Sequence, residues 1–150
     1  MIHEALMRLV AYATLLRMAM ARDYGLNVFQ FLSVLLIGGS ETGIGIKGLR
    51  EALPIPGSSL TFTLDSLEKR GYIKRARNRR DRRQWRLFLT AKGKRFYADV
   101  LERQSEAIGP SLEKFTETER ADFLRVADEI TRAGGLHLAP VDDAVEETTG

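Results

Sequence analysis

The sequence contains no cysteine and only two histidines, His3 and His137, which lie near opposite ends of the chain. The lack of cysteine excludes disulfide bonds, thiol redox sensing and zinc sites built from thiolates. A histidine metal cluster or a Ser-His-Asp triad would need the two chain ends to meet. We therefore expect no metal site, no cofactor and no catalytic residues, because no nucleophile and base can be paired from this sequence.

Long hydrophobic runs are also lacking. The longest strongly apolar stretch, near residues 29–37, is about half of what a membrane span requires. The start, Met1-Ile2-His3-Glu4, lacks the basic residues that open a signal peptide. At 150 residues, with 44% hydrophobic and 29% charged residues, the chain has the composition of one soluble globular domain. We expect a cytoplasmic protein without a membrane partner.

Acidic residues are nearly absent from residues 74–95, where eleven lysines and arginines accompany a single acid, Asp81. The net charge of +3 hides this asymmetry. Residues 138–150 carry four acids and no base, so the rest of the chain carries +7. Such a dense basic segment repels itself unless a polyanion neutralises it, and DNA phosphates are the usual partner. The alternative is exposed charge that only solubilises the fold, but arginine outnumbers lysine here, and arginine is the better phosphate ligand.

Hydrophobic periodicity and capping residues predict six helices and three short strands. Asn27 with Gln30 indicates a capping pair, Thr90 an N-cap, and Thr116 with Glu119 a capping box. Gly109-Pro110 is expected to interrupt the fifth helix. The predicted helices are 2–22, 27–37, 47–53, 58–70, 90–108 and 116–133, and the strands are 44–46, 72–76 and 84–89.

In the helix predicted over 58–70, Leu60, Leu64 and Leu67 fall within roughly 60° of one another at 100° per residue, so they should face the core. The opposite face carries Ser58, Phe62, Asp65 and Lys69, with Thr61 on its flank. Gly71 is placed to adopt the left-handed conformation after the helix. Trp85 is expected in the core beneath the hairpin.

Residues 43–48 spell GxGxxG, a pattern also found in dinucleotide-binding sites. Such a site requires a strand before the glycines and a βαβ unit around them. A short helix and a proline-rich turn follow instead. The glycines are therefore interpreted as a connector.

The apolar stripes of the first and last helices lie far from the central segment in sequence. About 70 residues of helix cannot all cover one small core, so both ends are expected to pack against a second copy of the chain. The alternative is that they fold back on their own domain.

Four segments closely resemble the multiple antibiotic resistance regulator (MarR) family: residues 49–53, 64–73, 81–83 and 89–93. The predicted order of elements, which is helix, helix, strand, helix-turn-helix, wing and long helix, is also similar to that of the family. The resemblance implies a mainly α fold with a small β-hairpin wing, a winged helix-turn-helix with N- and C-terminal dimerisation helices. It would form a single domain over 1–137, with the winged helix-turn-helix at about 40–95 and dimerisation helices at about 2–22 and 96–135. Residues 138–150 are predicted to be a disordered acidic tail.

The resemblance further implies a homodimer that inserts two recognition helices into successive major grooves of double-stranded DNA, with each wing in the adjacent minor groove. Arg83 would enter the minor groove, and Asp81 would orient it. Two residues depart from the family pattern. Pro56 replaces a frequent serine, and Phe62 stands where the family often has arginine, so bidentate recognition of guanine is unavailable. We expect Phe62 to contact thymine methyl groups; the alternative is that it packs against the wing or a neighbouring helix.

These inferences predict a repressor that binds a pseudo-palindromic operator and is relieved by a small aromatic or phenolic ligand. The alternative is a winged-helix module that binds protein or RNA without sequence-specific DNA recognition. The effector pocket is predicted near Tyr12, Arg17 and Met18. The predicted DNA contacts are Ser58, Thr61, Phe62, Lys69, Arg75, Arg77, Arg79, Arg80, Arg82 and Arg83.

Overall fold

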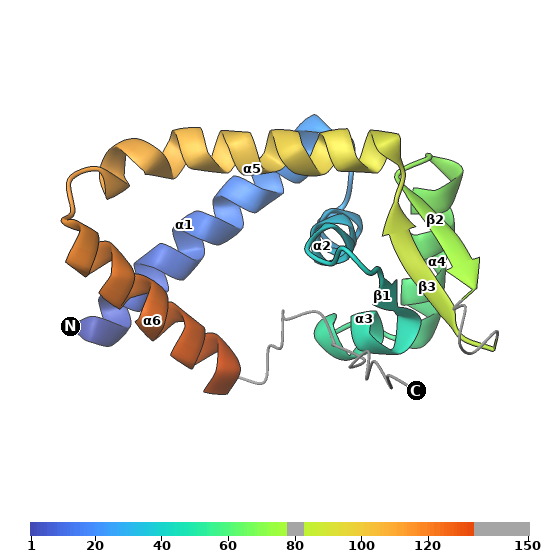
Figure 1. Cartoon of the computed structure of the whole chain (residues 1–150), viewed down its shortest axis with the longest axis horizontal. Helices are drawn as coiled ribbons and strands as arrows, with labels where there is room; N and C mark the ends of the chain where they lie inside the picture. The colour runs from blue at the N-terminus through green and yellow to red at the C-terminus, as the bar shows by residue number, and fades with distance from the viewer. Residues whose placement is uncertain (78–82, 134–150) are drawn as a thin grey trace, which may run out of the picture.

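The computed structural model describes residues 1–77 and 83–133. The chain is mainly helical with one small antiparallel sheet (Figure 1), which confirms the predicted fold class. The elements in chain order are α1 (Ile2–Asp23), α2 (Val28–Gly38), β1 (Ile44–Gly45), α3 (Ile46–Ala52), α4 (Gly57–Lys69), β2 (Ile73–Arg77), β3 (Trp85–Leu89), α5 (Ala91–Leu112) and α6 (Glu117–Ala133).

Helix α2 forms the centre of the core. Its start is fixed by the predicted capping pair, in which the Asn27 side chain accepts from the backbone N–H of Gln30 and the Gln30 side chain accepts from that of Asn27. The helix packs against α1, α4, α5 and β3, and Phe31, Val34 and Ile37 are fully buried. An 11-residue helix with this much apolar surface is stable because its neighbours cover it on several sides.

Helix α4 buries the face that the sequence predicts. Leu60, Leu64 and Leu67 are at most 2% exposed. The helix begins after Pro56, whose side chain makes no capping hydrogen bond. Gly71 follows the helix end with φ of +77°, which confirms the predicted left-handed residue. These features leave the other side of α4 free to face solvent.

The sheet has the order β1-β3-β2, and both pairs are antiparallel. Ile44 lies opposite Leu87, and Ile73 lies opposite Leu89. Since β1 leads directly into α3 and pairs antiparallel with β3, the βαβ unit of a dinucleotide site does not form around residues 43–48. The interpretation of these glycines as a connector is confirmed.

Helix α5 starts at the predicted cap, where the Thr90 hydroxyl accepts from the backbone N–H of Gly93 at 3.1 Å. The predicted interruption near Gly109-Pro110 is wrong, because α5 continues through Pro110 to Leu112. Proline removes one backbone donor, but Pro110 lies within the last turn, and the N–H of Glu113 still bonds to the carbonyl of Gly109 at 3.0 Å. The helix end therefore tolerates the proline.

Helix α6 also starts at the predicted capping box. The Thr116 hydroxyl and backbone N–H both donate to the Glu119 carboxylate at 2.8 Å, and the Glu119 N–H donates back to the hydroxyl at 3.3 Å. These hydrogen bonds, that of the backbone N–H first, hold the pKa of Glu119 below its ordinary value because they favour the charged carboxylate.

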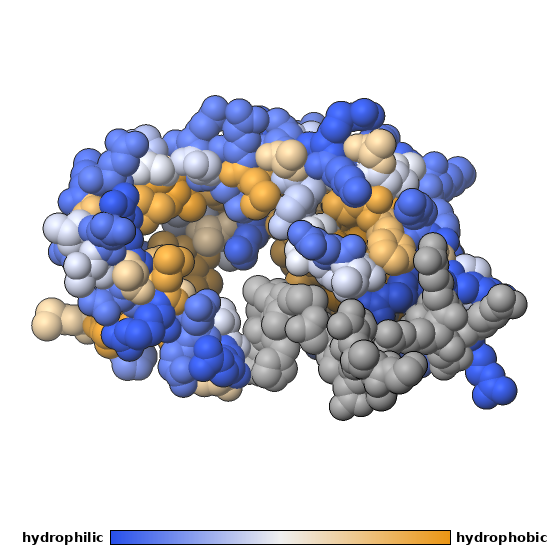
Figure 2. Space-filling view, viewed as in Figure 1, coloured by the Kyte–Doolittle hydropathy of each residue, from blue (hydrophilic) through white to orange (hydrophobic). Residues whose placement is uncertain are grey.

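Helices α1, α5 and α6 form an open frame at one end of the molecule, and the sheet with α3 and α4 lies at the other (Figure 1). Apolar side chains line the inner side of that frame in Figure 2. No residue of α6 is buried, and α1 buries only Met20 and Ala21 near its end. The large exposed side chains on these two helices include Leu6, Leu9, Tyr12, Leu15, Phe123, Leu124 and Ile130.

Candidate nucleic-acid interface

Helix α4 presents a polar and aromatic face to solvent. Ser58, Thr61, Phe62 and Lys69 are all exposed, as their helical positions predict. Phe62 is 73% exposed, so the alternative that it packs against the wing or a neighbouring helix is wrong for the single chain. A large aromatic side chain held in water is available for contact with a partner surface.

Arg75 lies on β2 and points at α4. One guanidinium nitrogen, Nη2, lies 2.6 Å from Oδ1 of Asp65, and the other, Nη1, lies 3.0 Å from Oε2 of Glu68. The side chain of Arg75 is 26% exposed. The predicted phosphate contact of this residue stays a prediction, but both ends of its guanidinium already have carboxylate partners.

The wing presents Arg77 and Trp85, which face each other at the ends of β2 and β3. The Arg77 guanidinium lies over the indole ring, 5.0 Å from its centre, in a cation–π contact. The expectation that Trp85 lies in the core is wrong, because the side chain is 41% exposed. Leu87 and Leu89 follow at alternate positions and are buried, whereas Trp85 lies at the far end of the strand, where the core has ended.

The tip of the wing is only partly described. Arg79, Arg80, Asp81 and Arg82 lie outside the described residues, so their predicted roles stay predictions. Arg83 is exposed in the turn that leads into β3.

A groove of about 550 Å³ separates α4 from the wing. Its lining combines apolar side chains of the core edge with a set of charged groups. The sequence did not indicate Arg50, Asp65 and Glu68 as neighbours here, because the meeting of α3, α4 and β2 around this groove is a property of the folded chain. The lining residues are Ile46, Arg50, Leu60, Thr61, Leu64, Asp65, Glu68, Arg75 and Trp85.

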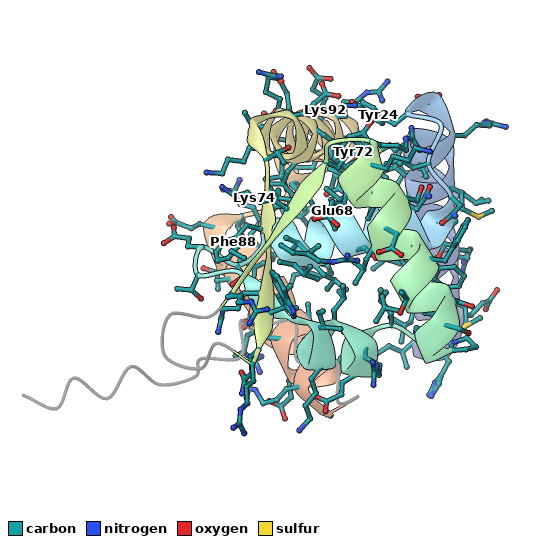
Figure 3. The ribbon with its side chains drawn as sticks, turned by 90° about the vertical axis from the view of Figure 1, so that its right-hand side faces the viewer. Tyr24, Glu68, Tyr72, Lys74, Phe88 and Lys92 are labelled. Atoms are coloured by element: carbon teal, nitrogen blue, oxygen red, sulfur yellow. The ribbon has the colours of Figure 1, made fainter. Side chains whose placement is uncertain are left out.

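The C-terminal end of α4 is attached to the rest of the molecule by cations. Arg70 donates to the carbonyl oxygens of Tyr24 and Gly25 at 3.1 and 2.8 Å. Lys92 Nζ donates to the carbonyl of Arg70 at 2.7 Å and lies 4.4 Å from the centre of the Tyr72 ring (Figure 3). Positive groups at this position also interact favourably with the negative C-terminal end of the helix dipole. The orientation of α4 is thus fixed from α5 and from the turn between α1 and α2.

The predicted effector residues Tyr12, Arg17 and Met18 lie on α1, and all three are exposed in the single chain. They line neither the groove beside α4 nor a second groove of about 300 Å³ beside α3 and β1. Their role stays a prediction.

A model of the MarR family matches residues 24–84, the segment that contains α2, β1, α3, α4 and β2. Residues 24–84 thus carry the sequence pattern of the MarR family. The chain is 41% identical over 61 residues to the HTH-type transcriptional regulator TtmR from Methylorubrum extorquens, a match that covers 41% of the chain. The chain spans 31% of the length of TtmR and 58% of that of a second curated relative.

Solved structures share the fold over nearly the whole chain. A MarR transcriptional regulator from Methanosarcina mazei is 27% identical with a TM-score of 0.67, over 92% of this chain and 98% of that one. FabT from Streptococcus pneumoniae, solved in complex with DNA, is 20% identical with a TM-score of 0.68, over 89% and 95% of the two chains. At that identity the likeness to FabT shows the fold alone.

Among the helices that the structure describes, none is both long enough and apolar enough to cross a membrane. Within residues 1–77 and 83–133, no three or more potential metal-ligating side chains come together.

Proposed function

We propose that this chain is a MarR-family, sequence-specific DNA-binding transcription regulator that acts as a homodimeric repressor on a pseudo-palindromic operator. The observation that carries the proposal is the exposed face of α4 beside a basic wing. An amphipathic helix that buries three leucines and shows Ser58, Phe62 and Lys69 to solvent can enter a major groove. The adjoining strands then bring Arg77 and Arg83 to the flanking backbone or minor groove.

Dimerisation is supported by the apolar surface that α1 and α6 expose. Soluble monomers rarely expose contiguous apolar patches of more than a few hundred Å². A second copy related by a twofold axis would cover this surface on both chains at once. The twofold axis would also present two α4 helices to successive major grooves, which lie about 34 Å apart along the duplex.

Base recognition is proposed to rest on Phe62, Ser58 and Thr61. The outward face of α4 carries no arginine to bond guanine, whereas an apolar side chain contacts the thymine methyl group in the major groove. The Thr61 hydroxyl already donates to the carbonyl of Gly57 at 3.1 Å, so only its lone pairs remain, and these can accept a hydrogen bond from the amino group of a base. This arrangement favours operators with thymine at the positions that Phe62 faces.

The proposal includes a small organic ligand that relieves repression. This ligand would be an aromatic or phenolic molecule bound near Tyr12, Arg17 and Met18. Such a ligand would act by binding better to a dimer whose α4 helices are wrongly spaced for DNA.

A gel-shift titration against the DNA upstream of the protein's own gene, at two salt concentrations, tests the proposal. We expect saturable retardation that scrambled DNA does not compete away and that weakens steeply with salt. Arg83→Ala should reduce it. Equal retardation of scrambled and upstream DNA would refute sequence-specific recognition and favour a winged-helix module that binds protein or RNA.

A further inference from the structure

Two acids lie on the side of α4 that faces the wing. Asp65 and Glu68 are one helical turn apart, and both reach the same guanidinium, that of Arg75 on β2. Figure 3 shows Glu68 between the helix and the strands. The carboxylates are 57% and 40% exposed, so each keeps part of its surface towards the groove while Arg75 lies beneath them.

This arrangement is costly for a DNA-binding surface unless the acids are neutralised. If α4 enters a major groove and the wing enters the adjacent minor groove, one phosphate strand crosses between them. Asp65 and Glu68 would then face that strand with a charge of −2, and Arg75 reduces it to −1. Two bonds from one planar group also fix the separation and tilt of β2 relative to α4, because a guanidinium holds two carboxylates in a rigid fork.

We propose that Arg75 is a positioning residue, which clamps the wing to the recognition helix and shields the two carboxylates of Asp65 and Glu68 from DNA phosphates. The inference rests on the proposed DNA binding and assigns Arg75 a role other than the phosphate contact that its sequence position predicts. To bind phosphate directly, Arg75 would have to leave both carboxylates, and those would then repel the same phosphate.

A mutant cycle distinguishes the clamp from a phosphate contact. Arg75→Gln is made in the wild-type chain and in the Asp65→Asn/Glu68→Gln chain, and affinity for a fluorescent operator is measured for all four proteins. In the clamp, Arg75→Gln weakens binding about tenfold in the wild-type chain, since groups in contact couple by about 1.4 kcal/mol. It weakens binding less than about threefold once the acids are neutral, because the variant then removes only the charge of Arg75.

A phosphate contact predicts the opposite order. Neutral partners would release Arg75 towards the DNA, so Arg75→Gln would cost as much or more in the Asp65→Asn/Glu68→Gln chain. An equal or larger drop in affinity in that chain overturns the inference. Lys74→Gln is the matched control, because Lys74 is the exposed neighbour on β2 and points away from α4 (Figure 3). Its effect should be equal in both chains.

A second measurement needs no DNA. Trp85 is the only tryptophan of the chain and lines the same groove as Arg75. Opening the clamp by Arg75→Gln should increase quenching of Trp85 fluorescence by acrylamide, and Lys74→Gln should leave quenching unchanged. Arg75→Lys keeps the charge but cannot hold both carboxylates, so it should give intermediate quenching, and it replaces Arg75→Gln if that variant does not fold.

Unchanged quenching in both Arg75 variants overturns the clamp. A wild-type chain that binds no operator would refute the proposed function instead, and the fluorescence result would still decide whether the clamp exists.

Discussion

Replacing Phe123 by alanine removes a large side chain from the apolar face of α6 and is expected to weaken the proposed dimer. Phe123 is 52% exposed in the single chain, and α6 has no buried residue, so the substitution should leave the fold of the chain intact. Ile130, 51% exposed, lies two turns further along the same face. A second copy of the chain would bury this apolar face of α6 in a symmetric dimer.

The expected effect follows from the exposed fraction of Phe123. Complete burial of a phenylalanine side chain stabilises by about 1.5–3 kcal/mol. If the partner covers the exposed half, the substitution removes about 0.8–1.6 kcal/mol of binding free energy per chain, and a twofold interface counts this twice. The sum, about 1.6–3.1 kcal/mol, corresponds to a rise of about 10- to 200-fold in the dimer dissociation constant.

Sedimentation equilibrium at several concentrations measures that constant, and circular dichroism checks that the helices remain. Arg125→Ala is the matched control, because Arg125 lies on α6 with a side chain 73% exposed and pairs with Asp122 of the same helix. It should leave the dissociation constant within about twofold, because an exposed ion pair contributes little. The same small change for Phe123→Ala, or a wild-type chain that is monomeric, would refute the assigned interface.

Three further changes test the core and the DNA face. Phe62→Ala should leave the unfolding temperature unchanged but weaken operator binding about 6- to 40-fold, the value for covering its 73% exposed ring; unchanged affinity and sequence preference would exclude base contact. Arg83→Ala should lower the slope of log affinity against log salt by about 0.9 for each phosphate that Arg83 neutralises, and an unchanged slope would remove Arg83 from the interface. Gly93→Ala places a Cβ 2.0 Å from the carbonyl oxygen of Tyr72 and should destabilise by about 1–3 kcal/mol or more in urea unfolding, whereas Gly109→Ala, with open space around its Cβ, should not.

Local patterns predicted the elements well. The caps at Asn27, Thr90 and Thr116 and the left-handed Gly71 depend on bonds within one or two turns of chain, so residue types at fixed spacing are sufficient. The buried face of α4 follows from helical periodicity alone. Periodicity and caps also predicted the order of the elements, and that order is part of the resemblance to the MarR family.

Features that depend on how elements meet were not predictable. Trp85 shares an alternating face with the buried Leu87 and Leu89, but the core ends before the strand does, and no local pattern marks that edge. The partners of Arg75 lie 10 and 7 residues earlier on a different element, so their contact requires the packing of α4 on β2. At Pro110 a local rule led to a wrong prediction. Proline was expected to interrupt α5, but Pro110 lies in the last turn, where proline destabilises the helix little.

The attachment of α4 through Arg70 and Lys92 uses main-chain oxygen atoms as acceptors at Tyr24, Gly25 and Arg70 itself. A substitution at position 24 therefore leaves these acceptors in place, whereas replacing Arg70 or Lys92 removes the hydrogen bonds that its side chain donates. Tyr24 and Gly25 follow α1 directly, so a displacement of the end of α1 would be passed to the C-terminal end of α4 through Arg70. Substituting Arg70 or Lys92 is therefore expected to loosen the end of α4 from the helical frame without changing any residue on the exposed face of α4.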